Sequence, residues 1–356
     1  MPQGFSLCGV RFSHPEPIPQ KIAIFPVFLP FSGCVKRCVF CAQETQSGRP
    51  QRAVECALAE AGRQLSLVKS RAESRPELAF FGGTFTALSA KERAMCLEFY
   101  SYWRNKGVVQ GLRCSTRPDA VNLTLLGELR EKGMTTVELG VQTFSSDALA
   151  RSGRGYDAET AIAAANMVRN AGMTLGLQLM PGMPGVTPET ARRDMERAVG
   201  LRPRWLRLYP CLVLANTDLE AWWRQGRYEP WEFSETLSFL ADACLEAWRM
   251  GVRVIRMGLA PEDDLKANVL AGPWHPSLGS MARGLALARY LKEKIGETGL
   301  AGARLCLWAP RRFQGEFWGY KGNLAAFYES QGLGRKNIRW HQGNDFVLTK
   351  AEGDSE

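Results

Sequence analysis

The chain has 356 residues, of which 45% are hydrophobic and 23% are charged, a composition that excludes a disordered or fibrous protein and allows a large core. No uncharged apolar stretch reaches the length of a membrane span. The first 20 residues lack the apolar run of a secretory signal, so we expect a cytoplasmic protein without membrane contact. The 45 Lys and Arg against 36 Asp and Glu give a net charge of +9, which favours a polyanionic partner.

From residue 21 to about 210, short apolar runs alternate with stretches of helical periodicity. Segments such as Ala87–Lys106 and Ala158–Asn170 repeat apolar residues at helical spacing. Six strand-and-helix units in series predict a parallel sheet that is either doubly wound or curled into a barrel. The six expected strands are Lys21–Leu29, Glu77–Phe81, Leu112–Thr116, Thr135–Val141, Met173–Met180 and Trp205–Tyr209.

The pattern changes after residue 210. Residues 217–250 are expected to form helices, 252–257 a strand, 262–279 a loop rich in Pro and Gly, and 280–295 another helix. A compact basic tail follows. We therefore expect four segments: an N-terminal extension (1–20), a barrel (21–215), a helical and strand extension that completes the side of the barrel (216–300), and a small α+β tail (301–356).

The most specific pattern is a group of three cysteines, Cys34, Cys38 and Cys41, in the loop that follows the first strand. Thiolates this close in sequence can converge on one metal centre, and they are the ligands of iron–sulfur clusters. Structural zinc is the alternative, but zinc takes four ligands, usually in two pairs. The other cysteines and the three histidines supply no such pair. Three ligands suit a four-iron cluster that keeps one iron open for an exogenous ligand.

The spacing of these cysteines, with the aromatic Phe40 before the last of them, resembles the signature of radical S-adenosylmethionine enzymes. The resemblance implies a partial (β/α)6 barrel, here with a C-terminal α+β extension. It also implies a [4Fe-4S] cluster on Cys34, Cys38 and Cys41, with S-adenosylmethionine bound at the open iron and cleaved to a 5'-deoxyadenosyl radical. A low-potential donor such as flavodoxin or ferredoxin would supply the electron.

The resemblance places the cofactor against residues at the ends of the predicted strands. Gly82 and Gly83 follow the second strand, where missing side chains let the backbone approach a ligand closely. Arg154 is expected at the cofactor carboxylate, although Arg151 is equally near in sequence. The residues expected to bind the cofactor are Phe40, Gly82, Gly83, Thr84, Glu138, Gln142, Arg154, Gln178 and Met180.

Several segments occur in the order and spacing of the radical domain of the Elongator catalytic subunit, which modifies the wobble uridine of tRNA. This likeness covers roughly residues 20–280 and implies an RNA (tRNA) substrate. We expect no room before Glu356 for the acetyltransferase-like domain of that subunit, so its acetyl-CoA chemistry is not carried over, and an acyltransferase acting in trans is a candidate partner. The segments are 115–119, 138–144, 154–155, 180–184, 207–217 and 272–276.

Four residues are candidates for catalysis or substrate binding. Arg117, Arg207 and Tyr209 lie at predicted strand C-termini, where parallel barrels place ligand-binding groups, and Tyr209 is a candidate relay for an electron or a hydrogen atom. His275 is either a packing residue or a substrate contact. Two alternatives stay open for the function. One is a radical enzyme acting on a small molecule such as a porphyrinogen, since coproporphyrinogen oxidase shares the 140–144 segment. The other is a non-catalytic iron–sulfur protein that binds RNA or senses redox state.

Residues 301–340 carry seven Lys or Arg against two Glu. Here a strand and a short helix precede Gly319-Tyr320-Lys321-Gly322, and a helix and two strands follow, an order that resembles a minimal KH-type RNA-binding unit. Glycines let the backbone meet phosphates, and lysine supplies charge. Gly319, Lys321 and Gly322 are therefore candidate nucleic-acid contacts. The alternative is a basic cap over the barrel with its aromatic residues in the core.

Overall fold

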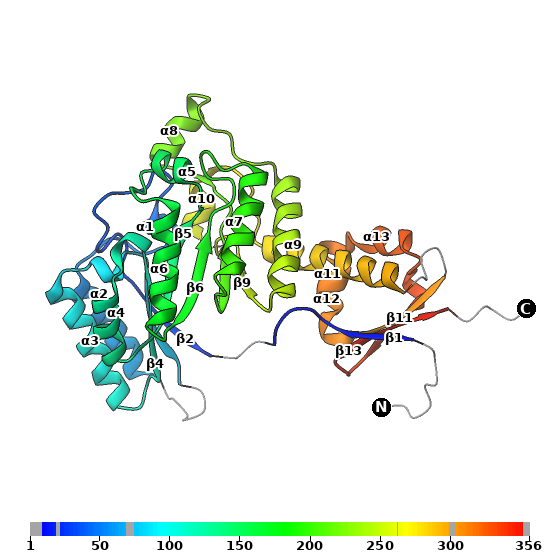
Figure 1. Cartoon of the computed structure of the whole chain (residues 1–356), viewed down its shortest axis with the longest axis horizontal. Coiled ribbons are helices and arrows are strands. Elements are labelled where there is room, and N and C mark those ends of the chain that lie inside the picture. Colours follow the sequence, from blue (N-terminus) through cyan, green and yellow to red (C-terminus); the bar gives the residue numbers. More distant parts are fainter. Residues whose placement is uncertain (1–8, 19–21, 69–74, 262, 299–303, 352–356) are drawn as a thin grey trace, which may run out of the picture. The chain divides into compact units, whose positions relative to one another are not determined.

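The computed structural model describes residues 9–18, 22–68, 75–261, 263–298 and 304–351 (Figure 1). The chain divides into two compact units. The barrel unit comprises residues 18–236 and 252–276, and the terminal unit comprises residues 1–17, 237–251 and 277–356. Within the described residues, no helix is both long and apolar enough to cross a membrane.

A seven-stranded parallel sheet forms the inner layer of the barrel unit, in the order β2-β3-β4-β5-β6-β7-β9. The expected partial barrel is confirmed, and all six expected strands are present. The strand expected at 252–257 joins the same sheet as a seventh member. The strands are β2 (Ile24–Phe28), β3 (Glu77–Phe81), β4 (Gly111–Thr116), β5 (Met134–Gln142), β6 (Thr174–Leu179), β7 (Trp205–Leu208) and β9 (Arg253–Met257).

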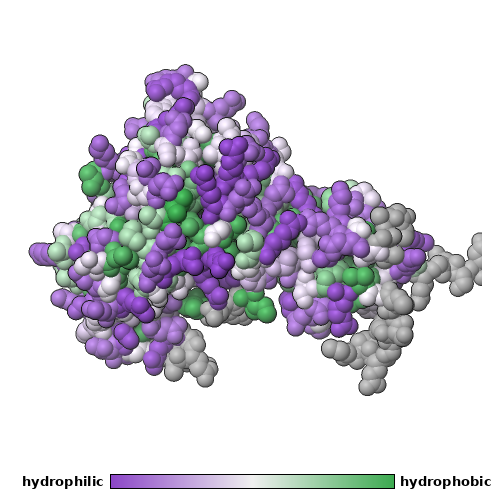
Figure 2. Space-filling model, in the orientation of Figure 1, coloured by the Kyte–Doolittle hydropathy of each residue, from purple (hydrophilic) through white to green (hydrophobic). Residues whose placement is uncertain are grey.

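Helices connect successive strands and cover the outside of the sheet (Figure 1). Capping residues fix where they begin: the Thr187 hydroxyl accepts from the Thr190 amide at the start of α7, where Pro188 occupies the first turn. Figure 2 shows mostly hydrophilic side chains over α7, whose Ala191 and Met195 are buried. The helices are α1 (Gln43–Ser47), α2 (Val54–Ser66), α3 (Ala90–Asn105), α4 (Leu123–Glu131), α5 (Ser146–Arg151), α6 (Ala158–Asn170), α7 (Pro188–Gly200) and α8 (Asp218–Arg224).

The segment expected to be a loop at 262–279 is partly regular. It contains α10 (Asp263–Asn268) and β10 (Val269–Ala271), which pairs antiparallel with β8 (Val213–Leu214). Leu265 is fully buried in a small apolar cluster with Leu212 and Leu214. This apolar anchor is a single residue among polar ones, so the periodicity of the sequence did not reveal the helix.

The terminal unit is an α+β fold with a four-stranded sheet in the order β1-β13-β11-β12. Strand β11 runs parallel to β12 and antiparallel to β13. Helices α11 and α13 lie on one side of this sheet (Figure 1). The strands are β1 (Val10–Ser13), β11 (Leu305–Pro310), β12 (Ile338–His341) and β13 (Asp345–Lys350), and the helices are α9 (Phe233–Arg249, from Leu237 on), α11 (Leu278–Glu297), α12 (Gln314–Trp318) and α13 (Ala325–Ser330).

One apolar core joins the helices to this sheet, and Phe317 of α12 stacks on Tyr328 of α13 at 3.9 Å between ring centroids. The two units divide the chain differently from the four expected segments. Strand β1 belongs to the expected N-terminal extension, yet it pairs with β13 from the expected tail, residue Phe12 opposite Phe346. Segments that are far apart in sequence thus form one sheet, which local sequence patterns do not predict.

Candidate active site

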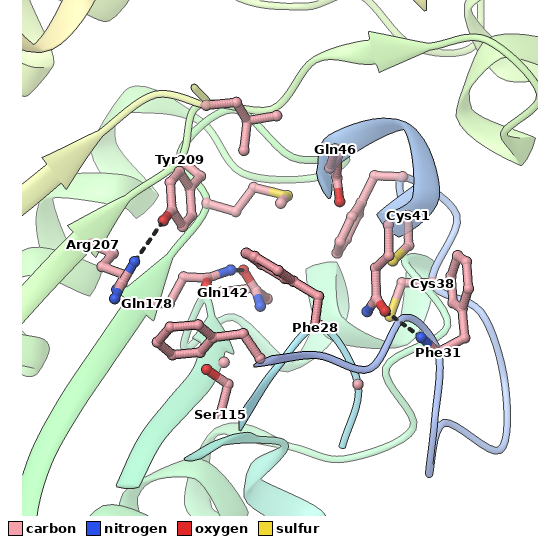
Figure 3. Close-up of a pocket in the computed structure, with 18 of the residues that line it drawn as sticks. Phe28, Phe31, Cys38, Cys41, Gln46, Ser115, Gln142, Gln178, Arg207 and Tyr209 are labelled. Carbon is pink, nitrogen blue, oxygen red and sulfur yellow. Dashed lines mark hydrogen bonds between the residues drawn. The ribbon is translucent and has the colours of Figure 1, made fainter. Parts of the chain in front are cut away.

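A cavity of about 1020 Å³ opens at the C-terminal ends of the parallel strands. Figure 3 shows Cys38 and Cys41 at one end of it and Arg207 and Tyr209 at the other. Phe28, Gln142 and Gln178 lie between them. Ligand sites of parallel barrels occupy this face because every strand delivers the residues at its C-terminal end to it.

The cysteine loop is held by close backbone contact with the glycine turn after β3. The Thr84 amide donates to the Ser32 carbonyl at 2.8 Å. A Cβ atom added to Gly83 would lie 2.1 Å from that same carbonyl oxygen, and one added to Gly33 would lie 2.3 Å from the Thr84 carbonyl oxygen. Only glycine fits at these two positions, so the turn predicted to approach the cofactor also fixes the position of the cysteine loop.

All three cysteines line the cavity. The Cys34 sulfur lies 3.2 Å from the Thr84 hydroxyl. Burial, together with the nearby Cys38 and Cys34, raises the pKa of the Cys41 thiol to about 12. Among the described residues, no three His, Cys, Asp or Glu side chains are gathered closely enough to hold a single metal ion. Three thiols on one cavity wall are the donor set of an iron–sulfur cluster, whereas structural zinc takes four ligands.

Arg154 projects into the cysteine end of the cavity. Its Nη1 donates to the Cys38 sulfur at 3.4 Å and its Nη2 donates to the Tyr156 hydroxyl at 2.8 Å. Burial opposes the charge of Arg154, but Tyr156 and Cys38 together outweigh it, so its pKa is raised. Arg154 thus places a positive charge beside one of the three sulfurs that line the cavity. Arg151 is exposed and pairs with Asp147 at 2.9 Å, so the structure separates two arginines that the sequence left equivalent.

Glu138 does not present a free carboxylate to the cavity. Its Oε2 lies 2.6 Å from Arg207 Nε, and its Oε1 lies 3.4 Å from Arg113 Nη1. Arg113 also pairs with Glu77, 2.6 Å from its Nε. Burial lowers the pKa of Arg207, but Glu138 and Tyr209 outweigh it, so the pKa is raised. Glu77, Arg113, Glu138 and Arg207 thus form a buried row of alternating charges. At its end, Arg207 Nη1 donates to the Tyr209 hydroxyl at 3.2 Å.

Gln142 sits at a bulge in β5, where the pairing with β6 shifts register after Gly140. Its φ is +70°, a left-handed value that is uncommon for a residue with a side chain. Its Oε1 accepts from Gln178 Nε2 at 3.2 Å, and both amides line the cavity. Bulges next to active sites redirect side chains, and this one turns a second amide toward the cavity.

Most of the other expected site residues line the same cavity, and four lie elsewhere. Arg117 lines the cavity while it pairs with Asp119 at 2.7 Å. His275 does not line it, and its ring packs 6.1 Å from Phe233. The cavity also receives Phe40, Gly82, Gly83, Thr84 and Met180, whereas Gly319, Lys321 and Gly322 belong to the terminal unit.

Sequence reasoning missed several residues around this cavity. Glu77 and Arg113 carry the charge row, and their signal was a charged residue within an otherwise apolar strand. Phe28 and Phe81 contribute aromatic surface, with ring centroids 6.2 Å apart. Tyr156 lies in the loop between α5 and α6, so no strand or helix pattern pointed to it. The sequence also did not show that it pairs with Arg154, two residues away.

Two family models match the chain. Residues 28–198 match the radical SAM superfamily, and residues 203–285 match the radical SAM C-terminal domain. Together these matches cover the cysteine loop and every strand of the barrel sheet except the first residues of β2.

Curated relatives match over part of their length. The tRNA uridine(34) acetyltransferase of Methanocaldococcus infernus is 27% identical over 241 residues, which is 61% of this chain and 43% of the relative. The same-named protein of Dehalococcoides mccartyi is 35% identical over 138 residues, 37% of this chain and 29% of the relative. Human Elongator complex protein 3 is 30% identical over 187 residues, which is 50% of this chain and 32% of the relative. The chain thus spans less than half the length of each of these relatives.

A solved structure has the same fold. The archaeal Methanocaldococcus infernus Elp3 with an N-terminal deletion superposes with a TM-score of 0.57 at 21% sequence identity. The likeness covers 79% of this chain and 64% of that one.

Proposed function

Because this chain belongs to the radical S-adenosylmethionine superfamily, we propose that it is the enzyme of a radical reaction on a base of RNA, in particular of tRNA. Superfamily members are enzymes with a [4Fe-4S] cluster and S-adenosylmethionine, which when bound and reduced supply a 5'-deoxyadenosyl radical. The curated relatives that act on tRNA uridine support the RNA substrate. The observation that carries the proposal is a single cavity that joins the three cysteines to the Arg207–Tyr209 pair.

At the cysteine end, the chain's own residues would hold the cofactors. Cys34, Cys38 and Cys41 would bind the cluster, and Arg154 would donate to the Cys38 sulfur from 3.4 Å. The turn at Gly82 and Gly83 lines the cavity and would offer its backbone to the cofactor. The amides of Gln142 and Gln178 offer donors and acceptors for the polar part of the nucleoside cofactor.

The other end of the cavity would receive the base. A volume of about 1020 Å³ is at the upper end of the range for small-molecule sites, which leaves room for a base beside the cofactor. Enzymes that act on a nucleobase extrude it into such a pocket and stack it on aromatic rings, a role that Phe28 and Phe81 would fill. Arg207 would meet an acceptor on the base, and Arg117 at the rim would meet a phosphate.

Three further elements belong to the proposal. A low-potential donor such as flavodoxin or ferredoxin would provide the electron, and an acyltransferase in trans would act if an acyl group is transferred. The setting would be the cytoplasm, a reducing compartment in which the thiols of Cys34, Cys38 and Cys41 stay available to a cluster.

The first test concerns the cluster ligands. After anaerobic reconstitution and reduction with dithionite, the wild type should release 5'-deoxyadenosine, and Cys41→Ala should lose both that product and most of its bound iron. Cys56→Ala is the matched control, because this cysteine is exposed on α2 and outside the cavity. The ligand assignment is wrong if Cys41→Ala keeps wild-type iron and product while Cys56→Ala behaves identically.

The second test concerns the substrate. Mass spectrometry of tRNA nucleosides from cells with and without the gene should reveal one modified nucleoside that is lost with the gene and restored by the wild type but not by Cys41→Ala. An unchanged nucleoside profile, together with substrate-dependent 5'-deoxyadenosine from a small molecule such as a porphyrinogen, would replace the RNA proposal.

A further inference from the structure

The terminal unit carries a tight glycine loop between α12 and α13 that the matched family regions do not include. Three of its four residues have left-handed backbone: Gly319 (φ 69°), Lys321 (φ 52°) and Gly322 (φ 76°). Gly319 is required by packing, since a Cβ there would lie 2.8 Å from Cγ of the buried Leu324. Gly322 has no such constraint: the nearest atom to an added Cβ is Arg335 Nη2, at 3.8 Å. The backbone at Gly322 therefore stays accessible.

Cations gather beside this loop. Lys321, Arg335 and Lys336 are exposed, and Arg335 lies 5.3 Å over the Trp318 ring, which fixes its guanidinium next to Gly322. None of these three forms an ion pair with a carboxylate among the residues that the structure describes. Other arginines of the terminal unit do, such as Arg249 with Glu293 at 2.6 Å. The loop is thus flanked by three cations that no carboxylate of the described residues neutralises.

The turn that holds Arg335 and Lys336 leads into a strand at the edge of the sheet. Strand β12 is the last strand of the four-stranded sheet and begins directly after the turn that holds Arg335 and Lys336. Its Arg339 side chain is exposed and its Nη1 donates to the Lys336 carbonyl at 2.8 Å. A sheet edge offers unpaired backbone groups to an extended chain, and here cations flank that edge.

We propose that this basic loop surface, made of Gly319–Gly322, Arg335, Lys336 and Arg339, binds the phosphate backbone of a single-stranded RNA segment. Glycine loops bring backbone amides against phosphates, and the cations neutralise them. Tyr320 is partly exposed on the loop and offers a ring on which a base stacks. The choice of RNA over other polyanions rests on the proposed function. The surface would bind a part of the RNA other than the base that reacts. This contact would add affinity without taking part in the chemistry.

The experiment measures binding of a fluorescein-labelled, 12-nucleotide single-stranded RNA to the reconstituted full-length protein by anisotropy at several salt concentrations. The variant Lys321→Glu/Arg335→Glu should bind about 100-fold more weakly, roughly tenfold per lost charge-assisted contact. The slope of log K against log salt should fall by about 1.4, for two phosphate contacts on a single strand. Lys321→Arg/Arg335→Lys should bind within about threefold of wild type, because it keeps both charges.

The matched control is Lys91→Glu/Lys132→Glu, which makes the same change in net charge at two exposed positions of the barrel unit. It should change affinity by about threefold at most at physiological salt, because screening limits the reach of distant charges. Circular dichroism of each variant checks that the fold is intact. An unchanged affinity and slope for Lys321→Glu/Arg335→Glu would overturn the surface. Competition by polyglutamate at equal charge would overturn RNA as the partner in favour of an acidic protein.

These outcomes separate the surface from the proposed function. If the charge-reversal variant binds RNA like wild type while the tRNA nucleoside still depends on the gene, the surface is wrong and the function stands. If the variant loses RNA binding but no tRNA nucleoside depends on the gene, the surface stands and the RNA-modifying function is wrong. Release of 5'-deoxyadenosine without RNA should be the same in both proteins, because Lys321 and Arg335 lie outside the cavity.

Discussion

Replacing Glu138 by Gln tests the buried charge row of the barrel. The side chain of Glu138 is only 5% exposed and contacts Arg207 at 2.6 Å and Arg113 at 3.4 Å. Removing one partner of a buried ion pair costs about 3–5 kcal/mol, because it leaves an uncompensated charge. Arg113 keeps Glu77, so Arg207 alone loses its carboxylate. We therefore expect Glu138→Gln to lower the free energy of unfolding by about 3 kcal/mol, the lower end of that range.

Urea unfolding of the cofactor-free protein under anaerobic, reducing conditions measures this change, and an unchanged m value confirms that the same surface unfolds. Glu189→Gln is the matched control: its carboxylate is 59% exposed and pairs with Arg193 at 3.0 Å, so the same chemical change should cost about 0.5 kcal/mol at most. Adding Arg207→Met to Glu138→Gln should restore the free energy of unfolding, because the buried cation that lost its carboxylate is then removed as well. Equal effects of Glu138→Gln and Glu189→Gln would refute the reasoning.

Gly83→Ala should displace the cysteine loop, because the added Cβ would lie 2.1 Å from the Ser32 carbonyl oxygen; iron bound after reconstitution should fall severalfold, and full iron occupancy would contradict the packing argument. Burial raises the pKa of the Asp194 carboxyl above its ordinary 3.8, against the bonds it accepts from Thr143 and Phe144. The folded state therefore binds the proton more tightly than the unfolded state, so the stability Asp194 contributes is complete below pH 3.8 and is lost as pH rises through the raised pKa. Urea unfolding should show the stability of wild type relative to Asp194→Asn falling across that window, and a rise would contradict the sign.

The sequence was sufficient to predict the cysteine end of the cavity because its determinants are local. Three cysteines within eight residues and a glycine pair after a strand are visible without a structure, and both line the cavity. The strands were predicted for the same reason, since apolar runs bounded by helical stretches follow from neighbouring residues alone. Arg151 ends α5 and Arg154 lies in the loop after it, and only the fold shows that Arg154 is the one that contacts Cys38.

The role of Glu138 illustrates what sequence reasoning could not reach. Its place on β5 was predicted to face a ligand, and it does line the cavity, but its carboxylate is engaged by Arg113 of β4 and Arg207 of β7. Such pairings depend on which strands are neighbours and on their register, so no single segment contains them. His275 was placed by analogy with a motif, and packing against Phe233 removes it from the cavity.

Strand β1 has a consequence for how the protein is made. It leaves the ribosome early, yet its hydrogen-bonding partner is β13, more than 330 residues later, with Val10 opposite Leu348. All seven barrel strands are synthesised before β13, so this half-barrel can form while the backbone groups of β1 are still unpaired. A nascent chain stalled anywhere before Asp345 exposes that edge to other chains, which makes completion of translation itself a protection against aggregation.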